Sequence, residues 1–291
     1  METILLATDL SEEARTATQT ALRLSEKLGA KLVLYNSFVM IQPAGGNRHA
    51  YQKRLEQEKE ARKEQLTELV TDYLEEHTAE PPSTEPPTAV QTEEKQALDL
   101  EYVISHEPPD KQLKQLLDEY EVDLMVVPPA HLNDIVGKKL DTLINELPCP
   151  LLKVPDSEEE VRFDTLVYTT DFGRPEQTVL PLLSTFIAHF ESSIKCLHIR
   201  TPKERDAMHV QRNMEDIKLL MEHSLEVEVD MALVSGDSAA SGIEKYVETH
   251  KVDVLIMRTR THSFIERAFQ PKTVVQKVSG HINIPVLILK D

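Results

Sequence analysis

Two short segments of the chain place Thr-Asp directly after an apolar run. The first reads "ILLATDLSEEA" over residues 4–14, and the second reads "TLVYTTDFGRPEQ" over residues 165–177. Asp9 and Asp171 therefore hold the same place in two similar segments. A carboxylate at the end of a strand can accept hydrogen bonds from a hydroxyl or amine of a ligand, or it can cap the turn that it begins. Both interpretations stay open at this point.

A group of cations follows a later apolar run, in the segment "IMRTRTHSFIERAFQPKTVVQKV". Its members are Arg258, Arg260, Arg267 and Lys272, in a chain whose formal net charge is −18. Arginines beside a helix N-terminus can bind phosphate. The same cations can instead pair with neighbouring carboxylates or lie in solvent, so an anion site is one of two interpretations.

Other chemistry is sparse in this sequence. It contains neither a Gly-x-Ser-x-Gly elbow nor an intact phosphate loop, and no histidine pair has convincing metal spacing. We expect His198, in "CLHIR", to be a strand residue rather than a catalyst. Cys149 and Cys196 lie in apolar runs and are expected to be reduced core residues. No catalytic residue and no metal site is predicted.

Length and charge limit the possible functions. The 291 residues suffice for two ordinary domains. The charge of −18 disfavours general binding to nucleic acid or to anionic membranes. The first residues lack the basic start and the apolar length of a signal peptide, and no apolar stretch is long enough for a membrane span. We therefore expect a cytoplasmic protein.

Apolar runs and helical periodicity alternate along the first half of the chain. Ser11 and Asp110 have the residue types of helix N-caps, and Gly29 that of a helix C-cap. An insertion rich in proline and threonine, near 80–90, predicts an irregular loop. The expected strands are 3–8, 31–38, 100–105, 123–129 and 149–154, with helices after 11, over 48–77, after 110 and over 138–146.

The second half repeats this alternation, with Ser238 as a predicted helix cap. The expected strands are 165–170, 193–200, 225–233, 252–258 and 284–290, with helices over 175–190, 203–223, after 238 and over 272–280. Alternating strands and helices indicate parallel strands with right-handed crossovers. The fold class is therefore α/β, with two tandem doubly wound five-stranded sheets. The acidic segment 155–162 marks the boundary between predicted domains 1–155 and 156–291.

The order of these motifs resembles the universal stress protein family in its tandem form, over the whole chain. The resemblance is carried by "ILLATDLS", "LVYTTDFG", "CLHI", "VSGDSAASGIEKYV", "VDLMVV", "VDVLIM", "LPCPLLKV" and "NIPVLILK". It implies strand order 3-2-1-4-5 in each domain, of the adenine nucleotide alpha hydrolase-like type. It also implies that ATP-binding members hold the nucleotide where the strand order reverses. The aspartate after the first strand is implied to hold the adenosine part.

The first half departs from the phosphate loop of ATP-binding members, which is Gly-x-x-Gly, nine residues, then Gly-Ser or Gly-Thr. Pro128 and His131 replace the first two glycines, and only five residues precede Gly137. Proline offers no amide hydrogen, and the shortened loop cannot reach around a triphosphate. We therefore expect the first site, with Thr8 and Asp9, to be degenerate and lost for ATP.

The second half lacks the loop glycines as well, since Arg258 and Thr261 stand in their places. The loop keeps nearly its full length, and Lys272 and Thr273 align with the final pair. Gly236, in "VSGDSAA", fits either close approach to a ligand or a turn. The candidate nucleotide or anion site is therefore placed at Thr170, Asp171, Gly236, Arg258, Arg260, Lys272 and Thr273.

The last strand of each domain is apolar and is expected at a sheet edge, which invites pairing with another strand. The resemblance implies dimers joined through this strand, and a tandem chain can make the contact internally. We expect pseudo-two-fold pairing of Leu151, Leu152 and Val154 with Val286, Leu287 and Leu289. Two independent domains on a flexible linker are the alternative, and a homodimer stays open.

Together these features predict a cytoplasmic universal stress protein with a regulatory or ligand-binding role, rather than a metabolic enzyme. The alternative is an adenine-nucleotide-binding protein with slow ATP hydrolysis in the second domain. ATP or another adenine nucleotide is the candidate ligand, and no further cofactor is expected. The expected partner is a small-molecule nucleotide rather than nucleic acid or membrane. A flavoprotein-like interpretation lacks an evident flavin site.

Overall fold

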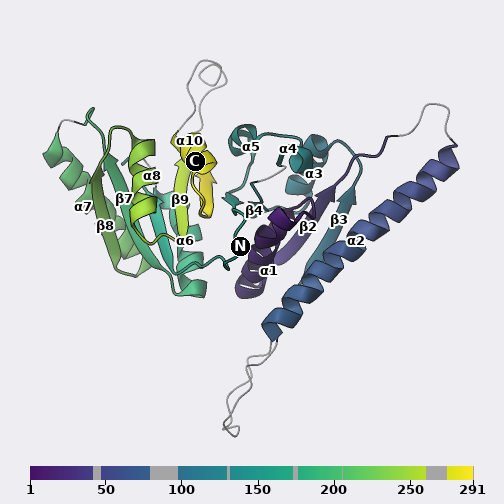
Figure 1. The fold of residues 1–291 in the computed structure, drawn as a ribbon. Helices are drawn as coiled ribbons and strands as arrows, with labels where there is room; N and C mark the ends of the chain where they lie inside the picture. Colours follow the sequence, from purple (N-terminus) through teal and green to yellow (C-terminus); the bar gives the residue numbers. More distant parts are fainter. Residues whose placement is uncertain are drawn as a thin grey trace, which may run out of the picture.

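A single twisted sheet organises the molecule (Figure 1). The computed structural model describes residues 1–41, 47–78, 98–129, 132–172, 176–204, 206–259 and 274–290. Across these residues, ten strands follow the order β3-β2-β1-β4-β5-β10-β9-β6-β7-β8. Neighbouring strands are parallel within each half, and the halves meet at the antiparallel pair β5 and β10. Each half therefore has the order 3-2-1-4-5, which confirms the predicted fold class.

The first half contains every predicted strand. The strands are β1 (Thr3–Ala7), β2 (Lys31–Ser37), β3 (Leu100–Ser105), β4 (Leu124–Val127) and β5 (Leu151–Lys153). The helices are α1 (Arg15–Leu28), α2 (Arg48–Thr78), α3 (Pro109–Glu119), α4 (Leu132–Val136) and α5 (Leu140–Glu146), with a 3₁₀ turn, η1 (Glu12–Ala14), before α1. The long helix α2 extends past the strands at the outer side of this half (Figure 1). The predicted insertion near 80–90 lies outside the described residues.

The second half repeats the same path. The strands are β6 (Thr165–Thr169), β7 (Ser193–Arg200), β8 (Val229–Ser235), β9 (Val254–Thr259) and β10 (Val286–Lys290). The helices are α6 (Glu176–Phe190), α7 (Ala207–Leu225), α8 (Ala239–Thr249) and α10 (Val274–His281). These bounds differ from the predicted ones by a few residues at the element ends, where helices fray and pattern is weakest.

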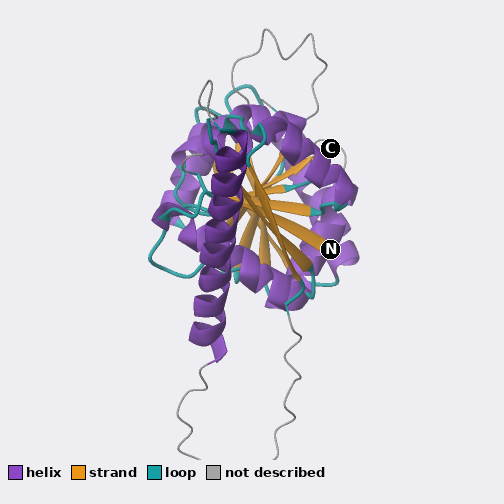
Figure 2. Ribbon diagram, turned by 90° about the vertical axis from the view of Figure 1, so that its right-hand side faces the viewer, coloured by secondary structure: helices purple, strands orange, loops and turns teal. Residues whose placement is uncertain are grey.

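Helices cover both faces of the sheet (Figure 2). One core cluster joins the sheet to α1, α2, α6 and α7, and the other joins it to α3, α4, α5, α8 and α10. Both clusters continue across the boundary, because side chains of β5 and β10 belong to each of them. The two halves therefore share two continuous apolar layers.

The seam between the halves has a defined register. Leu287 lies opposite Leu152, and Ile288 lies opposite Leu151. All four side chains are buried. Pairing removes one exposed edge from each half, which lowers the risk of strand addition by another chain. The pairing confirms the predicted contact through the last strands, but Lys153 and Ile288 take part in the register whereas the predicted Val154 and Leu289 lie outside it.

The segment between the halves lies against α1. Thr16 Oγ1 donates to the carbonyl of Ser157 at 2.9 Å and accepts from its amide at 3.2 Å. Arg23 donates to the carbonyl of Val161 at 2.7 Å and pairs with Glu160 at 2.8 Å. These contacts anchor the connection, which does not fit the alternative of a flexible linker.

Two helix ends follow the predicted signals. Gly29 ends α1 in the left-handed region at φ 62°, and its amide donates to the carbonyl of Ser25. Ser238 caps α8 by accepting from the amide of Ser241, and the Ser241 side chain accepts from the Ser238 amide in return. Glycine and serine act here as their conformational and hydrogen-bonding properties require.

Two other cap predictions are wrong. The hydroxyl of Ser11 does not cap a helix, because it donates to Asp9 Oδ1 at 2.6 Å, and α1 begins only after a 3₁₀ turn. Asp110 lies inside the first turn of α3, whose N-cap is Pro108. Neither N-cap residue, Ala14 of α1 or Pro108 of α3, makes a side-chain capping hydrogen bond.

Candidate functional site

A crevice opens in the second half at the carboxyl ends of β6 and β9, where the strand order reverses. Its volume is about 170 Å³. Thr170, Asp171 and Arg258, three of the predicted site residues, line it, together with His198 of β7. Thr169, Thr201 and Glu204 also line it. The remaining wall is apolar and consists of Leu197, Ile199, Ala239, Ile243, Met257, Val274 and Val275. Ligand sites are usually apolar pockets with a few convergent polar groups, and this crevice is smaller than their usual range of about 300–1,000 Å³.

An ion pair connects the two strands that flank the crevice. The Arg258 guanidinium lies 3.4 Å from Asp171 Oδ1. The Arg258 side chain is 5 % exposed, whereas that of Asp171 is 57 % exposed. A buried guanidinium requires an anionic or carbonyl acceptor, so Asp171 stabilises Arg258 in place. The exposed carboxylate keeps room to accept hydrogen bonds from a ligand.

The turn that carries Asp171 has a strained but well-supported backbone. Phe172 has φ 58°, and its amide donates to Thr170 Oγ1 at 3.1 Å. The first half has the same turn, because Leu10 has φ 67° and its amide donates to Thr8 Oγ1 at 3.2 Å. Large side chains rarely adopt positive φ, so the threonine hydroxyl and the surrounding packing hold this geometry.

His198 of β7 contacts the same turn. Its Nδ1 contacts the carbonyl of Thr170 at 2.8 Å, and its Nε2 contacts Glu204 Oε2 at 3.0 Å. The imidazole lies against the Phe172 ring, with ring centres 4.0 Å apart. Sequence reasoning placed His198 in a strand correctly but missed its contact with the Asp171 turn.

A signal for this contact was present in the sequence. In the first half, Asn36 of "LYNSF" donates from Nδ2 to the carbonyl of Thr8 at 2.8 Å. The register of β1 with β2 and of β6 with β7 makes Asn36 and His198 equivalent. A buried polar side chain at the same register position in the two strands therefore marks a shared role.

The remaining predicted residues lie apart from this group or beyond the described chain. Gly236 lines a neighbouring hollow with Arg200 and Asp237, rather than the crevice. A Cβ at Gly236 would meet Ile199 Cγ2 and the carbonyl of Ser238, both at 3.0 Å, so this glycine serves internal packing. Arg260, Lys272 and Thr273 lie outside the described residues, as do His131, Thr261 and Arg267.

The corresponding place in the first half is filled. Tyr35 is the register equivalent of Leu197, and Pro128 is the equivalent of Arg258. Helix α4, which the sequence did not predict, packs against β2, and Ser37 donates to the carbonyl of Ile135 at 2.8 Å. The side chains of Tyr35 and Ile135 are buried in one cluster with β1 and β4. The first half therefore keeps the turn and packs helix α4 against the strand beside it.

Asp9 has a structural role in that half. Its Oδ1 accepts from the Ser11 amide at 3.0 Å and from the Ser11 hydroxyl at 2.6 Å. This is the turn-capping arrangement that the sequence left open for Asp9.

Gly137 has φ 70° after the end of α4, and a Cβ there would lie 3.0 Å from the amide nitrogen of Asp110. It therefore acts as a helix-ending glycine packed against α3.

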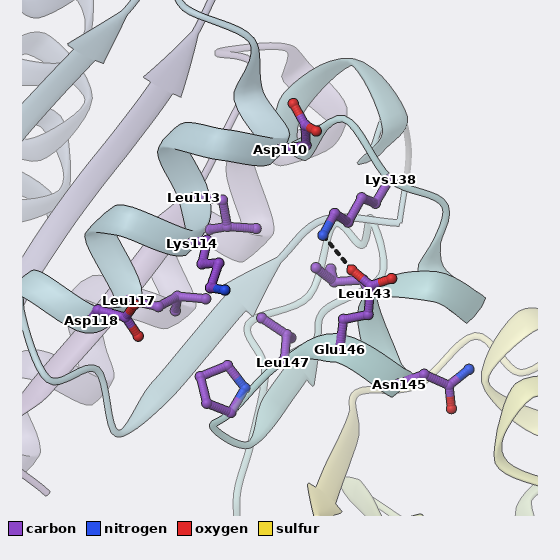
Figure 3. Close-up of a pocket in the computed structure, with 11 residues that line it drawn as sticks. Asp110, Leu113, Lys114, Leu117, Asp118, Lys138, Leu143, Asn145, Glu146 and Leu147 are labelled. Atoms are coloured by element: carbon purple, nitrogen blue, oxygen red, sulfur yellow. Dashed lines mark hydrogen bonds and ion pairs between the residues drawn. The ribbon is translucent and has the colours of Figure 1, made fainter. Parts of the chain in front are cut away.

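A larger groove of about 460 Å³ lies between α3 and α5 (Figure 3). Its apolar lining is formed by Leu113, Leu117, Leu143 and Leu147, and Lys138 pairs with Glu146 on the α5 side of it. Acidic and basic side chains alternate along the rim, and none of the predicted site residues lines it. Size alone therefore does not make it the functional site.

Other classes of site find no support in the described part of the chain. It contains no group of three or more His, Cys, Asp or Glu side chains that could hold a metal ion. Cys149 and Cys196 are both buried and unpaired with each other, and burial raises the pKa of the Cys149 thiol to about 12. Of the helices described, none has the length and apolarity to span a bilayer.

The chain is similar to known proteins over its full length. The model of the universal stress protein family matches residues 1–155 and 163–290. A universal stress protein from Archaeoglobus fulgidus shares the fold with a TM-score of 0.66 at 14 % identity, over 99 % of this chain and 96 % of that one. A functionally unknown protein from Pseudomonas aeruginosa has a TM-score of 0.59 at 13 % identity, over 100 % and 92 %. A search of the curated proteins gives no match.

Proposed function

Since the chain belongs to the universal stress protein family, we propose that it is a cytoplasmic regulatory protein of the stress response. In this proposal the crevice of the second half binds an adenine nucleotide, and the first half serves as a structural partner that binds none. The two domains are those predicted from the sequence, 1–155 and 156–291.

One observation carries the proposal. The same turn occurs in both halves, but a crevice lies beside it in the second half, whereas in the first half helix α4 packs against β2 there. The crevice is bounded by strand ends and by the first residues of α8 and α10, which is where doubly wound sheets bind ligands. An apolar crevice with a few charged side chains at that place supports a ligand there.

The walls favour a nucleoside with a phosphate. Ile199, Ile243 and Met257 offer apolar surface for a flat base. The exposed carboxylate of Asp171 can accept from an amine or a ribose hydroxyl. Arg258 lies at the base of the crevice and can exchange its contact with Asp171 for a phosphate oxygen, since guanidinium binds both kinds of oxyanion. Arg260, Lys272 and Thr273 complete the proposed site.

Binding rather than catalysis is the proposal. His198, the histidine that lines the crevice, has both ring nitrogens engaged by Thr170 and Glu204. A general base needs a nitrogen free to take a proton from the attacking group. Slow hydrolysis by other means is therefore a secondary candidate.

Isothermal titration of the full-length protein with ATP, AMP and adenosine tests the proposal. We expect Asp171→Asn to lower the affinity for ATP by about 10- to 150-fold, which is the effect of losing one charge-assisted hydrogen bond. Asp9→Asn is the matched control and should leave the affinity unchanged, because Asp9 caps a turn beside filled space. No binding of any of the three compounds, or equal losses in both variants, would overturn the proposal.

A further inference from the structure

The crevice of the second half adjoins a second space. A hollow of about 480 Å³ lies at the carboxyl ends of β7 and β8, and Thr201 and Glu204 line both the hollow and the crevice. The crevice alone is smaller than the usual range of ligand pockets, which is about 300–1,000 Å³. A ligand of nucleotide size therefore extends beyond the crevice, and the hollow beside Glu204 has room for part of it.

Glu204 is held at the boundary between the two spaces. Its amide donates to the carbonyl of Thr201 at 3.0 Å, and its Oε2 lies 3.0 Å from Nε2 of His198. The His198 side chain is 3 % exposed and its Nδ1 contacts the carbonyl of Thr170 at 2.8 Å, so the ring beside Glu204 is itself fixed. The Glu204 side chain is 37 % exposed. A carboxylate that is already positioned and accessible can accept a hydrogen bond from a ligand at a low cost in ordering.

The first half shows that the turn does not require a negative charge at this place. Asn36 is the register equivalent of His198, and it donates to the carbonyl of Thr8. Its Oδ1 accepts from Arg62 Nη1 at 3.1 Å. A guanidinium therefore lies against the supporting side chain in the first half, and a carboxylate lies there in the second. Because either sign of charge is compatible with the turn, the negative charge of Glu204 is available for another role.

The charged groups of the site follow the order of the strands. Arg258 lies on β9, Asp171 follows β6 and Glu204 follows β7, and these strands are consecutive in the sheet. Neighbouring strands lie about 4.8 Å apart, so the strand ends that carry Arg258 and Glu204 are separated by about 10 Å. A nucleotide whose phosphate contacts Arg258 and whose ribose contacts Asp171 thus directs its base toward Glu204 and the hollow.

The hollow offers the base two carboxylates and one guanidinium, from Glu204, Asp237 and Arg200. An exocyclic amine of a purine donates hydrogen bonds, so it can be bound by either carboxylate. A carbonyl at the same position of the purine only accepts, so it would face a carboxylate oxygen without a hydrogen between them. Arg200 can donate to a ring nitrogen of the base. This set of donors and acceptors favours an aminopurine over its oxo analogue.

We propose that Glu204 selects a purine with an exocyclic amine, by accepting a hydrogen bond from that amine at the boundary of the crevice and the hollow. This inference rests on the proposed function, because it concerns how the same site recognises its base. His198 is the positioning residue that holds Glu204 there. Asp237 and Arg200 line the hollow and offer the base its further contacts.

Isothermal titration of the full-length protein with ATP and with ITP tests the selection, because in ITP a carbonyl replaces the amine of the base. We expect ATP to bind about 10- to 150-fold more tightly than ITP, which is the effect of one charge-assisted hydrogen bond. Equal affinities, or tighter binding of ITP, would overturn the inference and leave a nucleotide site in place. Absence of binding by both compounds would overturn the proposed function together with the inference.

Two variants test whether the selection comes from Glu204. Glu204→Gln keeps the length of the side chain, but its amide can donate or accept, so the ratio of the ATP and ITP affinities should fall toward one. Glu204→Arg copies the charge of Arg62 in the first half and should reverse the preference, since a guanidinium donates to a carbonyl. Each ratio is measured within one variant, so a partial loss of folded protein does not alter it.

Glu228→Gln is the control, because Glu228 is an exposed carboxylate that precedes β8, at the opposite end of that strand from the hollow. Its ratio of ATP and ITP affinities should equal that of the wild type. If either Glu204 variant keeps the wild-type ratio, or if Glu228→Gln changes the ratio as much as Glu204→Gln does, Glu204 is not the residue that selects the amine.

Discussion

Lys153 of β5 donates from Nζ to the carbonyl of Ser279 in α10 at 2.6 Å, across the seam between the two halves. A longer contact, at 3.4 Å, reaches the carbonyl of Ile282. The last carbonyls of a helix lack hydrogen-bond donors within the helix and carry partial negative charge. A lysine supplies both the donor and a compensating positive charge. A strand of one half therefore completes a helix of the other.

Lys290 makes the reciprocal contact. From β10 it donates to the carbonyls of Asn145 and Leu147, at the end of α5 in the first half. The two lysines do not occupy equivalent register positions, because Lys153 lies opposite Val286 and Lys290 lies beyond the paired residues. The seam is thus joined by strand pairing and by two helix-capping cations.

Lys153 makes the free energy of unfolding depend on pH in the alkaline range. Burial lowers the pKa of its ammonium below the ordinary 10.5. Between that lowered pKa and 10.5 the unfolded chain binds more protons than the folded one, so the free energy of unfolding rises with pH in this window. Lys153→Met lacks this contribution. In urea denaturation, the unfolding free energy of the wild type relative to that of Lys153→Met should therefore be larger near pH 10 than near pH 7.

Lys251→Met, at a side chain that is 65 % exposed, is the control for general effects of losing a cation. If the unfolding free energy of the wild type relative to that of Lys153→Met falls or stays constant as pH rises, Lys153 is not buried in the folded protein.

A charge in the seam should separate the halves. Leu287 lies buried opposite Leu152, and Leu287→Glu places an unpaired carboxylate there. We expect a loss of about 3–5 kcal/mol in unfolding free energy and a larger radius in small-angle scattering. Leu219→Glu, at a side chain that is 66 % exposed on α7, should change stability by at most about 0.5 kcal/mol. An unchanged scattering profile and melting temperature for Leu287→Glu would reject the seam.

Gly242 permits the close packing of α8 on β7. A Cβ at this position would overlap Cγ2 of Ile199. Gly242→Ala should therefore lower stability by about 1–3 kcal/mol through overpacking, which exceeds the gain in helix propensity of about 1 kcal/mol. Ile199→Ala should relieve the clash in the double variant, so the two effects should be non-additive in a thermodynamic cycle.

Gly280 of α10 provides the control, because a Cβ there meets no atom within 4 Å. Gly280→Ala should stabilise the protein by about 0.5–1 kcal/mol through helix propensity alone. If the melting temperatures of both alanine variants change in the same direction, the packing of Ile199 against Gly242 would be contradicted.

The strands and helices were predictable because their signals are local, whereas the strand order and the seam followed from the resemblance to a family. Apolar runs give strands, and the apolar last strands, Leu151–Lys153 and Val286–Lys290, need a partner for their edges. The aspartate turns were also recognisable from their repeated motif. Alignment with the glycine positions put Pro128 and Arg258 in equivalent places, and the strand register agrees.

Features that depend on tertiary contacts were not predictable. Helix α4 is five residues long and gives little periodicity. The partner of His198 is Glu204, whose role follows only from the path of the chain after β7. The lysine caps join residues that are 126–145 positions apart in the sequence. Sequence pattern carries no information on such contacts.

Hydrogen–deuterium exchange of the full-length protein with and without ATP tests most directly whether the second half holds the ligand. We expect slower exchange at the turn 170–172, at the end of β7 and in the first turn of α8, because these backbone segments border the crevice. We expect no change at the matched turn 8–10 and the end of β2. Protection of the first half, or equal protection of both turns, would show that the second half is not the ligand site.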